Sequence, residues 1–392
     1  MGVKKSLLNL FTVASGVAVG NLYVIQPLLG ELTKDLHTTT AQNGWLVTAV
    51  QLGYATGIAL VLPLGDLFDR RKMAPVLLTI AGLSLVAAGL SASYWLLFAA
   101  LAVLGVTTIS GQLLVPLTNE LSDDASRGKN SAKVVSGMIL GILLARTVSG
   151  SLTDLIGWHL ALVVVGGINL ALMLLMRNAI PVLPARPSQN YFALLSGAPR
   201  LLWRNPRGFG LMLVSACALF VFSTVWTSIT FYFTDAPYHW SSAQIGLWGL
   251  VGAAGAFGAR VVGPLLDKGY SRIISASAWL IAAVSLAIGT LANQSTWFVA
   301  IMLVVMDFGA QGIGVVNQTR LLTTFSEARS RINATYVTTN FIAAAIGSAV
   351  TSLLWPTLGW AGLMWLCAGI CLVALAGWFA VAFRRSLRSD GN

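Results

Sequence analysis

The fold of this chain can be approached from one stretch, Gly65-Asp66-Leu67-Phe68-Asp69-Arg70-Arg71-Lys72. It lies between two long apolar runs, residues 44–64 and 73–92. Charge confined so tightly between hydrophobic segments is typical of a loop at a membrane surface. Its carboxylates and cations are also close enough to bind neighbouring helix ends. We therefore interpret residues 65–72, the latch loop, as a junction that holds helices together at one face of a membrane.

The composition of the whole chain also indicates a membrane protein. Of the 392 residues, 56% are hydrophobic and 9% are charged, whereas soluble domains carry about 25% charged residues. The formal net charge is +11. Once the cations are assigned to membrane loops, no basic face remains for nucleic acid. Cys217, Cys367 and Cys371 all fall within apolar runs and are interpreted as buried side chains, not as a disulfide or metal site.

Twelve apolar runs are long enough to cross a bilayer as helices. They lie near residues 7–29, 42–64, 73–92, 94–118, 132–156, 157–177, 208–233, 243–266, 271–291, 296–319, 332–355 and 360–383. Backbone groups inside lipid must be hydrogen-bonded within their own segment, so these runs predict an all-α polytopic protein. Pro27 is expected to kink the first span.

The distribution of cations sets the predicted orientation. Lysines and arginines gather in the loops on the side of the two termini, whereas the opposite loops contain Lys34. This asymmetry places both termini in the cytoplasm. The chain is therefore expected to be a multi-pass protein of a bacterial cytoplasmic membrane, and the asymmetry also accounts for the net charge.

Residues 178–207 divide the predicted spans into two sets. The segment is rich in proline and arginine and contains no acid, which predicts a cytoplasmic linker between a six-helix bundle at residues 1–177 and another at residues 208–392. Apolar and aromatic residues between Tyr191 and Trp203 form either a short helix on the bilayer surface or part of an ordinary linker.

The two halves repeat each other in sequence. Ala41-Gln42-Asn43-Gly44 recurs as Ala243-Gln244-Ile245-Gly246, and Gly157-Trp158 recurs as Gly359-Trp360. The latch loop recurs as Gly263-Pro264-Leu265-Leu266-Asp267-Lys268. Two parallel six-helix repeats suit alternating access, in which the halves rock around a site near the middle of the membrane.

Two ionisable residues lie deep within predicted spans. Asp307 is about 17 Å into its span and Arg146 about 21 Å into another, at 1.5 Å per residue. A charge at such depth costs about 3 kcal/mol, so each is expected to face a cavity or a partner. Asp307 is either a proton-binding carboxylate or a member of a structural ion pair. We predict that Arg146 and Asp307 interact in one conformational state.

The pattern of the chain resembles the major facilitator superfamily. Gly65-Asp66-Leu67-Phe68-Asp69-Arg70 is similar to that family's signature after its second span. The stretch from Asn21 to Leu29 and Asn317-Gln318-Thr319-Arg320 resemble a branch of bacterial exporters, similar to drug/proton antiporters. The resemblance implies that Gly65, Asp69, Arg70, Asp267 and Lys268 act in gating, in contact with the opposing bundle.

The same resemblance implies a substrate cavity lined by spans one, four, seven and ten. The polar and aromatic residues that these spans and span eleven offer are Asn21, Tyr23, Gln26, Gln112, Trp226, Thr227, Gln311, Tyr336 and Asn340. Serines and threonines in such spans commonly bond neighbouring helices instead. A mostly apolar wall with few polar groups suits a small amphiphilic organic compound.

The function expected from these features is secondary active transport, with proton-coupled export of that compound. Import of a nutrient by a uniporter or proton symporter is the alternative, and a membrane sensor with a transporter fold is a further one. No catalytic constellation or phosphate-cradling loop is found, so the chain is not expected to be an enzyme or to use ATP. The expected partners are substrate, protons and lipid, with no cofactor and a monomeric state.

Overall fold

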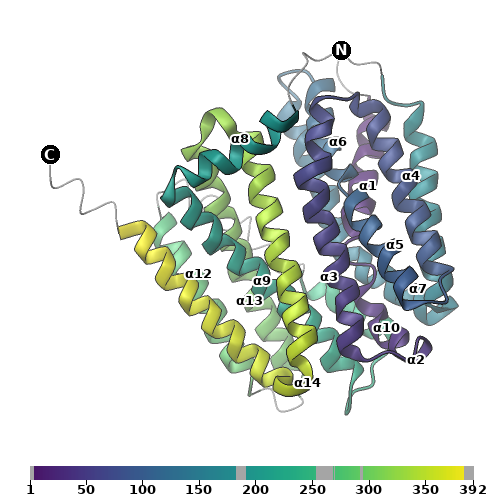
Figure 1. Ribbon diagram of the computed structural model, residues 1–392, viewed down its shortest axis with the longest axis vertical. Helices are drawn as coiled ribbons and strands as arrows, with labels where there is room; N and C mark the ends of the chain where they lie inside the picture. Colours follow the sequence, from purple (N-terminus) through teal and green to yellow (C-terminus); the bar gives the residue numbers. More distant parts are fainter. Residues whose placement is uncertain (1–3, 182–190, 253–267, 269, 292–294, 384–392) are drawn as a thin grey trace. The chain divides into compact units, whose positions relative to one another are not determined.

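The structure is a computed structural model that describes residues 4–181, 191–252, 268, 270–291 and 295–383. All regular elements in these ranges are helices (Figure 1). Contacts divide the chain into two compact units. Unit 1 consists of Met1–Leu195 and Thr230–Leu250, and unit 2 of Ser196–Ile229 and Val251–Asn392. The ends of predicted spans seven and eight therefore pack with the first repeat, although they belong to the second repeat in sequence.

The first half of the chain contains the elements α1 (Lys5–Gly20), η1 (Gln26–Leu28), α2 (Leu29–Asp35), α3 (Thr40–Thr56), η2 (Gly57–Val61), η3 (Leu62–Asp66), α4 (Arg70–Gly89), α5 (Tyr94–Thr107), α6 (Ser110–Leu121) and α7 (Arg127–Arg177). The described elements of the second half are α8 (Tyr191–Trp203), α9 (Pro206–Thr234), α10 (Ser242–Val251), α12 (Ser271–Gly289), α13 (Thr296–Thr324), η4 (Ser326–Ala328) and α14 (Arg329–Phe383).

Two of these helices each contain two predicted spans. α7 is broken at Gly157 (φ 78°, ψ 157°) and α14 at Gly359 (φ 56°, ψ −161°). A positive φ favours glycine, which has no Cβ to clash with the backbone. Both breaks fall at the predicted span boundaries, in the repeated Gly-Trp pair, and Figure 1 shows α14 reversing its direction there. The repeat therefore marks two equivalent turns.

The number of spans agrees with the prediction. Within the described residues, eight helices are long and apolar enough to cross a membrane. α7 and α14 each count as two, and the shorter apolar helices α1 and α10 belong to two further spans. The chain is thus an all-α membrane protein consistent with twelve spans.

Two predicted spans contain breaks near their middle. α1 ends at Gly20, and tight turns follow in which Tyr23 N–H donates to the Gly20 carbonyl at 2.8 Å. Pro27, within η1, has no N–H to continue a helix, so the predicted kink is present. Span four breaks between α5 and α6. There the Thr108 hydroxyl bonds the Leu104 carbonyl at 2.7 Å, a contact that often bends helices and that the sequence analysis missed.

Glycines let α1 and α7 approach closely. A Cβ placed on Gly141 would lie 2.0 Å from the Gly16 carbonyl oxygen, and one on Gly137 would lie 2.3 Å from the Thr12 carbonyl oxygen. Helices in lipid associate through close van der Waals packing, which small residues permit. The Gly16–Gly20 and Gly137–Gly141 pairs thus provide complementary faces with small residues four apart.

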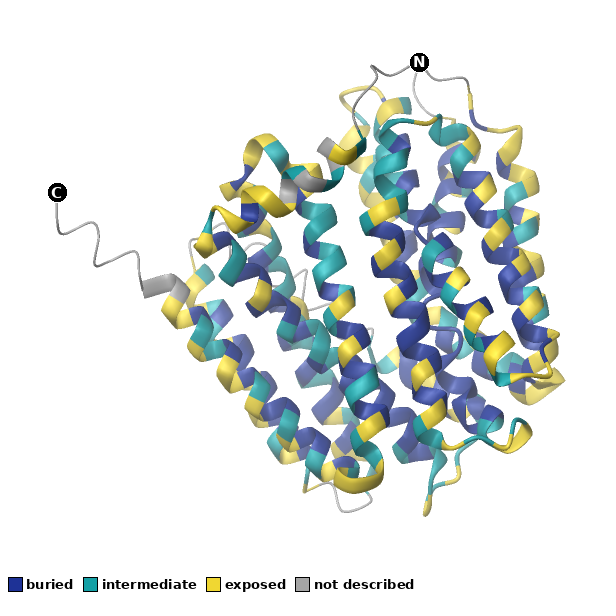
Figure 2. Cartoon of the chain, in the orientation of Figure 1, coloured by how far each residue is buried: buried dark blue, intermediate teal, exposed yellow. Residues whose placement is uncertain are grey.

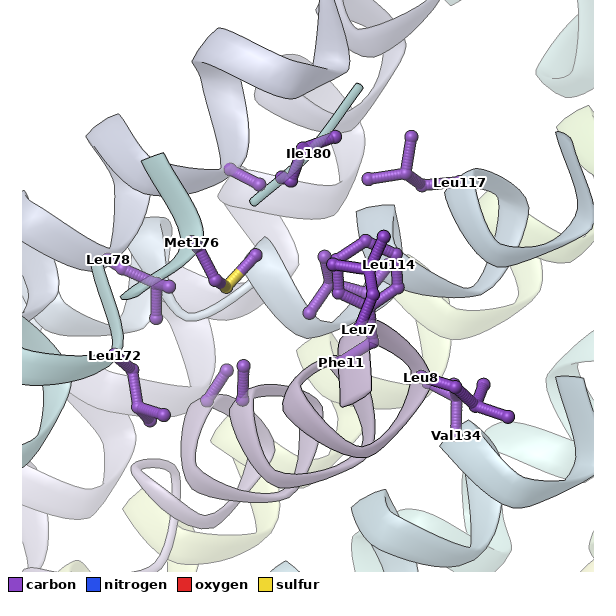
Figure 3. Packing of buried hydrophobic residues seen from close by; sticks show 13 residues of the cluster. Leu7, Leu8, Phe11, Leu78, Leu114, Leu117, Val134, Leu172, Met176 and Ile180 are labelled. Atoms are coloured by element: carbon purple, nitrogen blue, oxygen red, sulfur yellow. The ribbon is translucent and has the colours of Figure 1, made fainter. Parts of the chain in front are cut away.

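A hydrophobic cluster fills the end of unit 1 nearest the N-terminus. Figure 3 shows Phe11 of α1, Leu78 of α4, Leu114 of α6 and Met176 of α7 packed together. All four side chains are fully buried. The cluster joins four helices that are far apart in sequence and so fixes the spans on which the candidate site is built.

The outer faces of the helices remain apolar. Figure 2 shows exposed residues alternating with buried ones along the spans, and the exposed ones include Leu155, Trp95 and Val373. A soluble protein seldom exposes so many large apolar side chains, whereas lipid-facing surfaces do.

Candidate functional site

The buried arginine of unit 1 is held by residues from the broken first span. Arg146 of α7 is 3% exposed. Its Nε donates to Gln26 Oε1 at 2.7 Å, and its Cζ lies 4.4 Å from the centroid of the Tyr23 ring. A charge-assisted hydrogen bond and a cation–π contact both favour a guanidinium away from water. The sequence analysis selected all three residues but did not foresee that they meet.

α10 packs tightly against α7 around this arginine. A Cβ on Gly246 would lie 2.4 Å from the Arg146 carbonyl oxygen, and one on Gly150 would lie 2.2 Å from the Ser242 carbonyl oxygen. The Thr147 hydroxyl donates to the Gly246 carbonyl at 3.0 Å. One turn farther along α7, Asp154 Oδ2 accepts the Ala243 N–H at 3.2 Å. The backbone of Arg146 is therefore part of a close helix–helix contact.

Other predicted cavity residues of unit 1 have different surroundings. Gln112 Nε2 donates to the Tyr54 hydroxyl at 3.0 Å, which links spans four and two. Asn21 Nδ2 donates to Asn169 Oδ1 at 2.9 Å, and both amides are buried. Asn21 thus ties span one to span six, which is a structural role. The sequence analysis missed Tyr54 and Asn169, because no local signal pairs them with residues so distant along the chain.

In unit 2, the central feature is the buried carboxylate on α13. Asp307 is 3% exposed, while Gln311, one turn later, is exposed. Two residues after the aspartate, Gly309 lets α13 approach α12, since a Cβ there would lie 2.9 Å from the Ala278 carbonyl oxygen. Arg146 and Asp307 belong to different units, so their interaction stays a prediction.

The remaining predicted cavity residues are buried on α9 and α14. Trp226 and Thr227 lie on α9, and Asn340 lies on α14. The hydroxyl of Tyr336 donates to the Gly314 carbonyl at 3.3 Å and accepts from Ser215 at 3.4 Å. Within the described part of the chain, the buried Thr227 hydroxyl has no hydrogen-bond partner.

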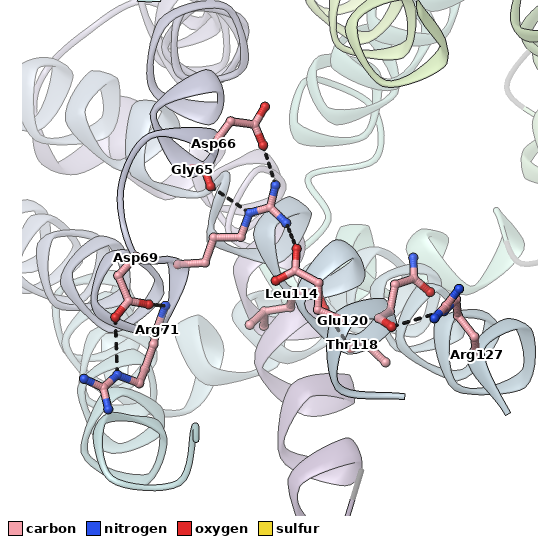
Figure 4. A network of polar contacts seen from close by, with 10 residues as sticks. Gly65, Asp66, Asp69, Arg71, Leu114, Thr118, Glu120 and Arg127 are labelled. Atoms are coloured by element: carbon pink, nitrogen blue, oxygen red, sulfur yellow. Dashed lines mark hydrogen bonds and ion pairs between the residues drawn. The ribbon is translucent and has the colours of Figure 1, made fainter. Parts of the chain in front are cut away.

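The latch loop forms a compact ionic cluster, drawn in Figure 4. Arg70 donates to Asp66 Oδ1 and to Glu120 Oε1, each at 2.6 Å, and its Nε donates to the Gly65 carbonyl at 2.9 Å. Asp69 caps α4 by accepting the Arg71 N–H at 2.9 Å. Glu120, at the end of span four, was missed, although an acid at a strongly basic membrane face is a usable signal.

The second latch cannot be compared in full. Asp267 lies outside the described residues, and Lys268 is exposed. Contact of either latch with an opposing bundle therefore stays a prediction.

The exporter-like motif at residues 317–320 connects helices within unit 2. Gln318 Nε2 donates to Asn333 Oδ1 at 2.7 Å. Arg320 donates to the Ser271 hydroxyl at 2.8 Å, and its Cζ lies 5.6 Å from the centroid of the Trp378 ring. The motif thus joins α13 to α12 and α14.

Comparison with known proteins identifies the family. The sequence profile of the Major Facilitator Superfamily matches residues 11–347 and 236–391. The chain is 34% identical over 377 residues to the putative uncharacterized transporter YgaY of Escherichia coli K12, covering 95% of both chains. It is 31% identical over 382 residues to the probable transporter SCO4007 of Streptomyces coelicolor, covering 96% of this chain and 87% of that protein.

Solved structures share the fold. A bacterial homologue of the human lysosomal transporter Spinster superposes with a TM-score of 0.80 at 16% identity, covering 97% of this chain and 98% of that one. The nucleoside transporter NupG superposes with a TM-score of 0.75 at 15% identity, covering 96% and 99%. Together with the helix pattern and the latch loop, these matches show that the chain belongs to the major facilitator superfamily of membrane transporters.

Proposed function

We propose that this transporter couples the export of a small amphiphilic organic compound to the proton gradient. The observation that carries the proposal is the buried carboxylate of Asp307 on α13. A charge within the hydrocarbon region costs about 3 kcal/mol. Proton binding removes that charge, so loading and release of a proton changes the free-energy balance between two conformations of the protein.

Arg146 is proposed to respond to the charge of Asp307. The contacts with Gln26 and Tyr23 hold its guanidinium in one orientation. In the proposed cycle, the arginine and the deprotonated aspartate attract each other in one conformation, and proton binding at Asp307 weakens that attraction. Substrate then competes for the same groups, which links its movement to that of the proton.

The proposed substrate site lies where the first span departs from helical geometry. Irregular backbone at membrane depth is tolerated where it is buried in protein or lines a cavity. The described turns from Asn21 to Ile25 lead directly to Gln26, and the break in span four directly precedes α6, which carries Gln112. An aromatic ring, two amides and one guanidinium among apolar side chains favour an amphiphilic organic compound.

Alternating access supplies the proposed mechanism. The close packing of α7 with α10 joins helices of different repeats, on the side that the positive-inside pattern makes external. We propose that this contact separates when the site opens outward. The cytoplasmic latch loops are proposed to engage in the same step.

The proposal is tested by transport measurements. A thermal-shift screen of amphiphilic organic compounds on the purified protein identifies a ligand, because binding stabilises the folded state. Uptake of that ligand into proteoliposomes is then measured with imposed pH gradients of either sign. Asp307→Asn should retain ligand-induced stabilisation and lose the response to the gradient.

Asp124→Asn is the matched control, since this exposed carboxylate pairs with Arg127 at the membrane surface. It should transport like the native protein. Gradient-dependent flux in Asp307→Asn would exclude the proposed coupling residue. Accumulation driven in the same direction as proton entry would instead support import by symport.

A further inference from the structure

α8 carries an exposed aromatic face that transport does not require. Phe192 and Trp203 are 76% and 77% exposed. They are eleven residues apart, which places them within about 20° of each other around the helix axis. Pro199, on the same face, is also exposed. The helix therefore presents a continuous apolar stripe along its length.

The opposite side of α8 packs against the protein and fixes the direction of this stripe. Leu202 is 1% exposed. At the other end of the helix, the Tyr191 hydroxyl donates to the Leu60 carbonyl at 2.7 Å. Because both ends of α8 are held through this side, the stripe cannot rotate inward without breaking these contacts.

A well-defined corner prevents α8 from continuing into the membrane span that follows. Asn205 caps α9 by accepting the Gly208 N–H at 3.0 Å, and Pro206 begins α9. Asparagine at the cap and proline at the first helical position are the preferred residues for such a start. The rings of Trp203 and Phe209 meet edge to face, with centroids 5.6 Å apart. α8 therefore leaves the end of α9 at an angle, as Figure 1 shows.

Arginines flank the apolar stripe. Arg200 and Arg204 are exposed and lie about 80° and 120° from Phe192 around the helix. Arg331 of α14 approaches α8 as well, since its Nη1 would lie 3.4 Å from a Cβ on Gly197. In the described part of the chain, none of these three arginines has a carboxylate within 4.0 Å.

We propose that α8 is a membrane-surface helix that binds the headgroups of anionic phospholipids. Phe192 and Trp203 insert among the acyl chains at the interface, and Arg200, Arg204 and Arg331 bind lipid phosphates. A helix with one aromatic face and arginines at its borders has the properties of an interfacial helix. Guanidinium groups bind phosphate through paired N–H donors. The predicted cytoplasmic position places α8 beside the inner leaflet, where anionic headgroups attract cations.

The experiment measures lipid preference at α8 in the full-length protein. A fluorophore is attached at Phe192→Cys in a variant whose Cys217, Cys367 and Cys371 are replaced by alanine, and the protein is placed in phosphatidylcholine nanodiscs. Small fractions of spin-labelled phosphatidylglycerol or spin-labelled phosphatidylcholine are then added as quenchers. The effective affinity for phosphatidylglycerol should be at least ten-fold higher. Arg200→Gln with Arg204→Gln should abolish most of that preference, because each arginine near an anionic surface contributes about five-fold.

Lys4→Gln with Lys5→Gln is the matched control. It removes the same charge on the same predicted side, from exposed residues distant from α8 in sequence, and it should leave the preference intact. Equal quenching by the two lipids in the native protein would overturn the proposal. So would quenching by aqueous iodide without quenching by either lipid, which would show that the stripe faces water and serves a soluble partner.

Discussion

Unit 1 contains two arginines whose surroundings are opposite in character. Arg70, at the membrane surface, contacts the carboxylates of Asp66 and Glu120. Arg146, within the membrane, contacts the amide oxygen of Gln26 and the ring of Tyr23. The first cluster joins opposite charges, whereas the contacts of the second orient a charge without adding a negative one.

This difference predicts which cluster matters more for transport. Water and salt screen charges at a surface, and replacing one member of such a pair changes stability by about 1 kcal/mol or less. Within the membrane no such replacement is available, and a displaced or lost charge changes the energy of each conformation directly. We therefore expect changes at Arg146 to affect transport strongly and changes at Arg70 to alter its rate moderately.

The largest effect is expected for Arg146→Gln. Transport in proteoliposomes should fall about 100-fold, because the site loses its cation and Gln26 Oε1 loses its donor, which alone costs about 1–3 kcal/mol. Arg146→Lys should retain part of the activity, since lysine keeps the charge but lacks the planar guanidinium. Arg127→Gln, at an exposed ion pair, is the control. A folded Arg146→Gln protein with native flux would remove the distinction between the two clusters.

A strong effect is also expected where α10 meets the backbone of Arg146. Gly246→Leu places side-chain atoms where 2.4 Å separates the first carbon from a carbonyl oxygen, so α7 and α10 must separate. Transport should fall more than ten-fold, while a cysteine introduced at Thr147 should react faster with a membrane-impermeant thiol reagent added from outside.

The control for this experiment is Gly167→Leu. A Cβ on Gly167 meets no atom within 4 Å, and the residue is exposed, so transport and labelling should remain native. Equal effects of the two substitutions would show that the close packing at Gly246 has no special role.

A moderate effect is expected at the surface cluster. Glu120→Gln should slow transport a few-fold and leave ligand-induced thermal stabilisation unchanged, because the latch loop is remote from the proposed substrate site in sequence and position along the span. Arg70→Gln should slow it further, since Arg70 also bonds Asp66 and the Gly65 carbonyl. In a double-mutant cycle, the two substitutions should show a coupling of about 0.5–1 kcal/mol. Loss of ligand binding in Glu120→Gln would contradict this division of roles.

The smallest effect concerns Asp123, in the loop between α6 and α7. The Ser126 hydroxyl donates to this carboxylate and lowers its pKa below the ordinary value. A group with a lowered pKa in the folded state stabilises the protein above its unfolded pKa and loses that contribution as the pH falls through the folded pKa. Ser126→Ala should therefore reduce thermal stability slightly at neutral pH, and the difference should disappear below about pH 4.

Melting temperatures measured from neutral to acidic pH test this expectation. A difference between native protein and Ser126→Ala that grows as the pH falls would have the wrong sign. Such a result would show that the loop is stabilised by something other than the ionised carboxylate.

The spans and their turns were predictable from sequence, whereas the breaks inside them were only partly so. The repeated Gly157-Trp158 and Gly359-Trp360 pairs marked two turns, because a left-handed backbone conformation needs glycine. Pro27 marked one break through its missing N–H. The break after Thr107 carries no proline or glycine at the interruption, so the sequence analysis had no comparable signal there.

The candidate site was predictable by residue type but not by contact. A lone cation or carboxylate within an apolar run is conspicuous, which identified Arg146 and Asp307. The partners could not be identified in this way: Gln26 is 120 residues from Arg146 and Asn169 is 148 from Asn21. Buried amides are common hydrogen-bonding groups, and nothing local distinguishes one that lines a site from one that joins two helices.

The sequence by itself determined the membrane class, the number of spans, the turn positions and the charged loops. Each of these depends on local properties: the length of an apolar run, the conformational freedom of glycine, and the cost of burying charge. Tertiary structure alone decided that Gln26 and Tyr23 hold Arg146, that Glu120 completes the Arg70 cluster, and that α10 packs on α7. Those contacts depend on how helices distant in sequence pack against one another, because small residues set where their backbones approach and so determine which polar groups meet.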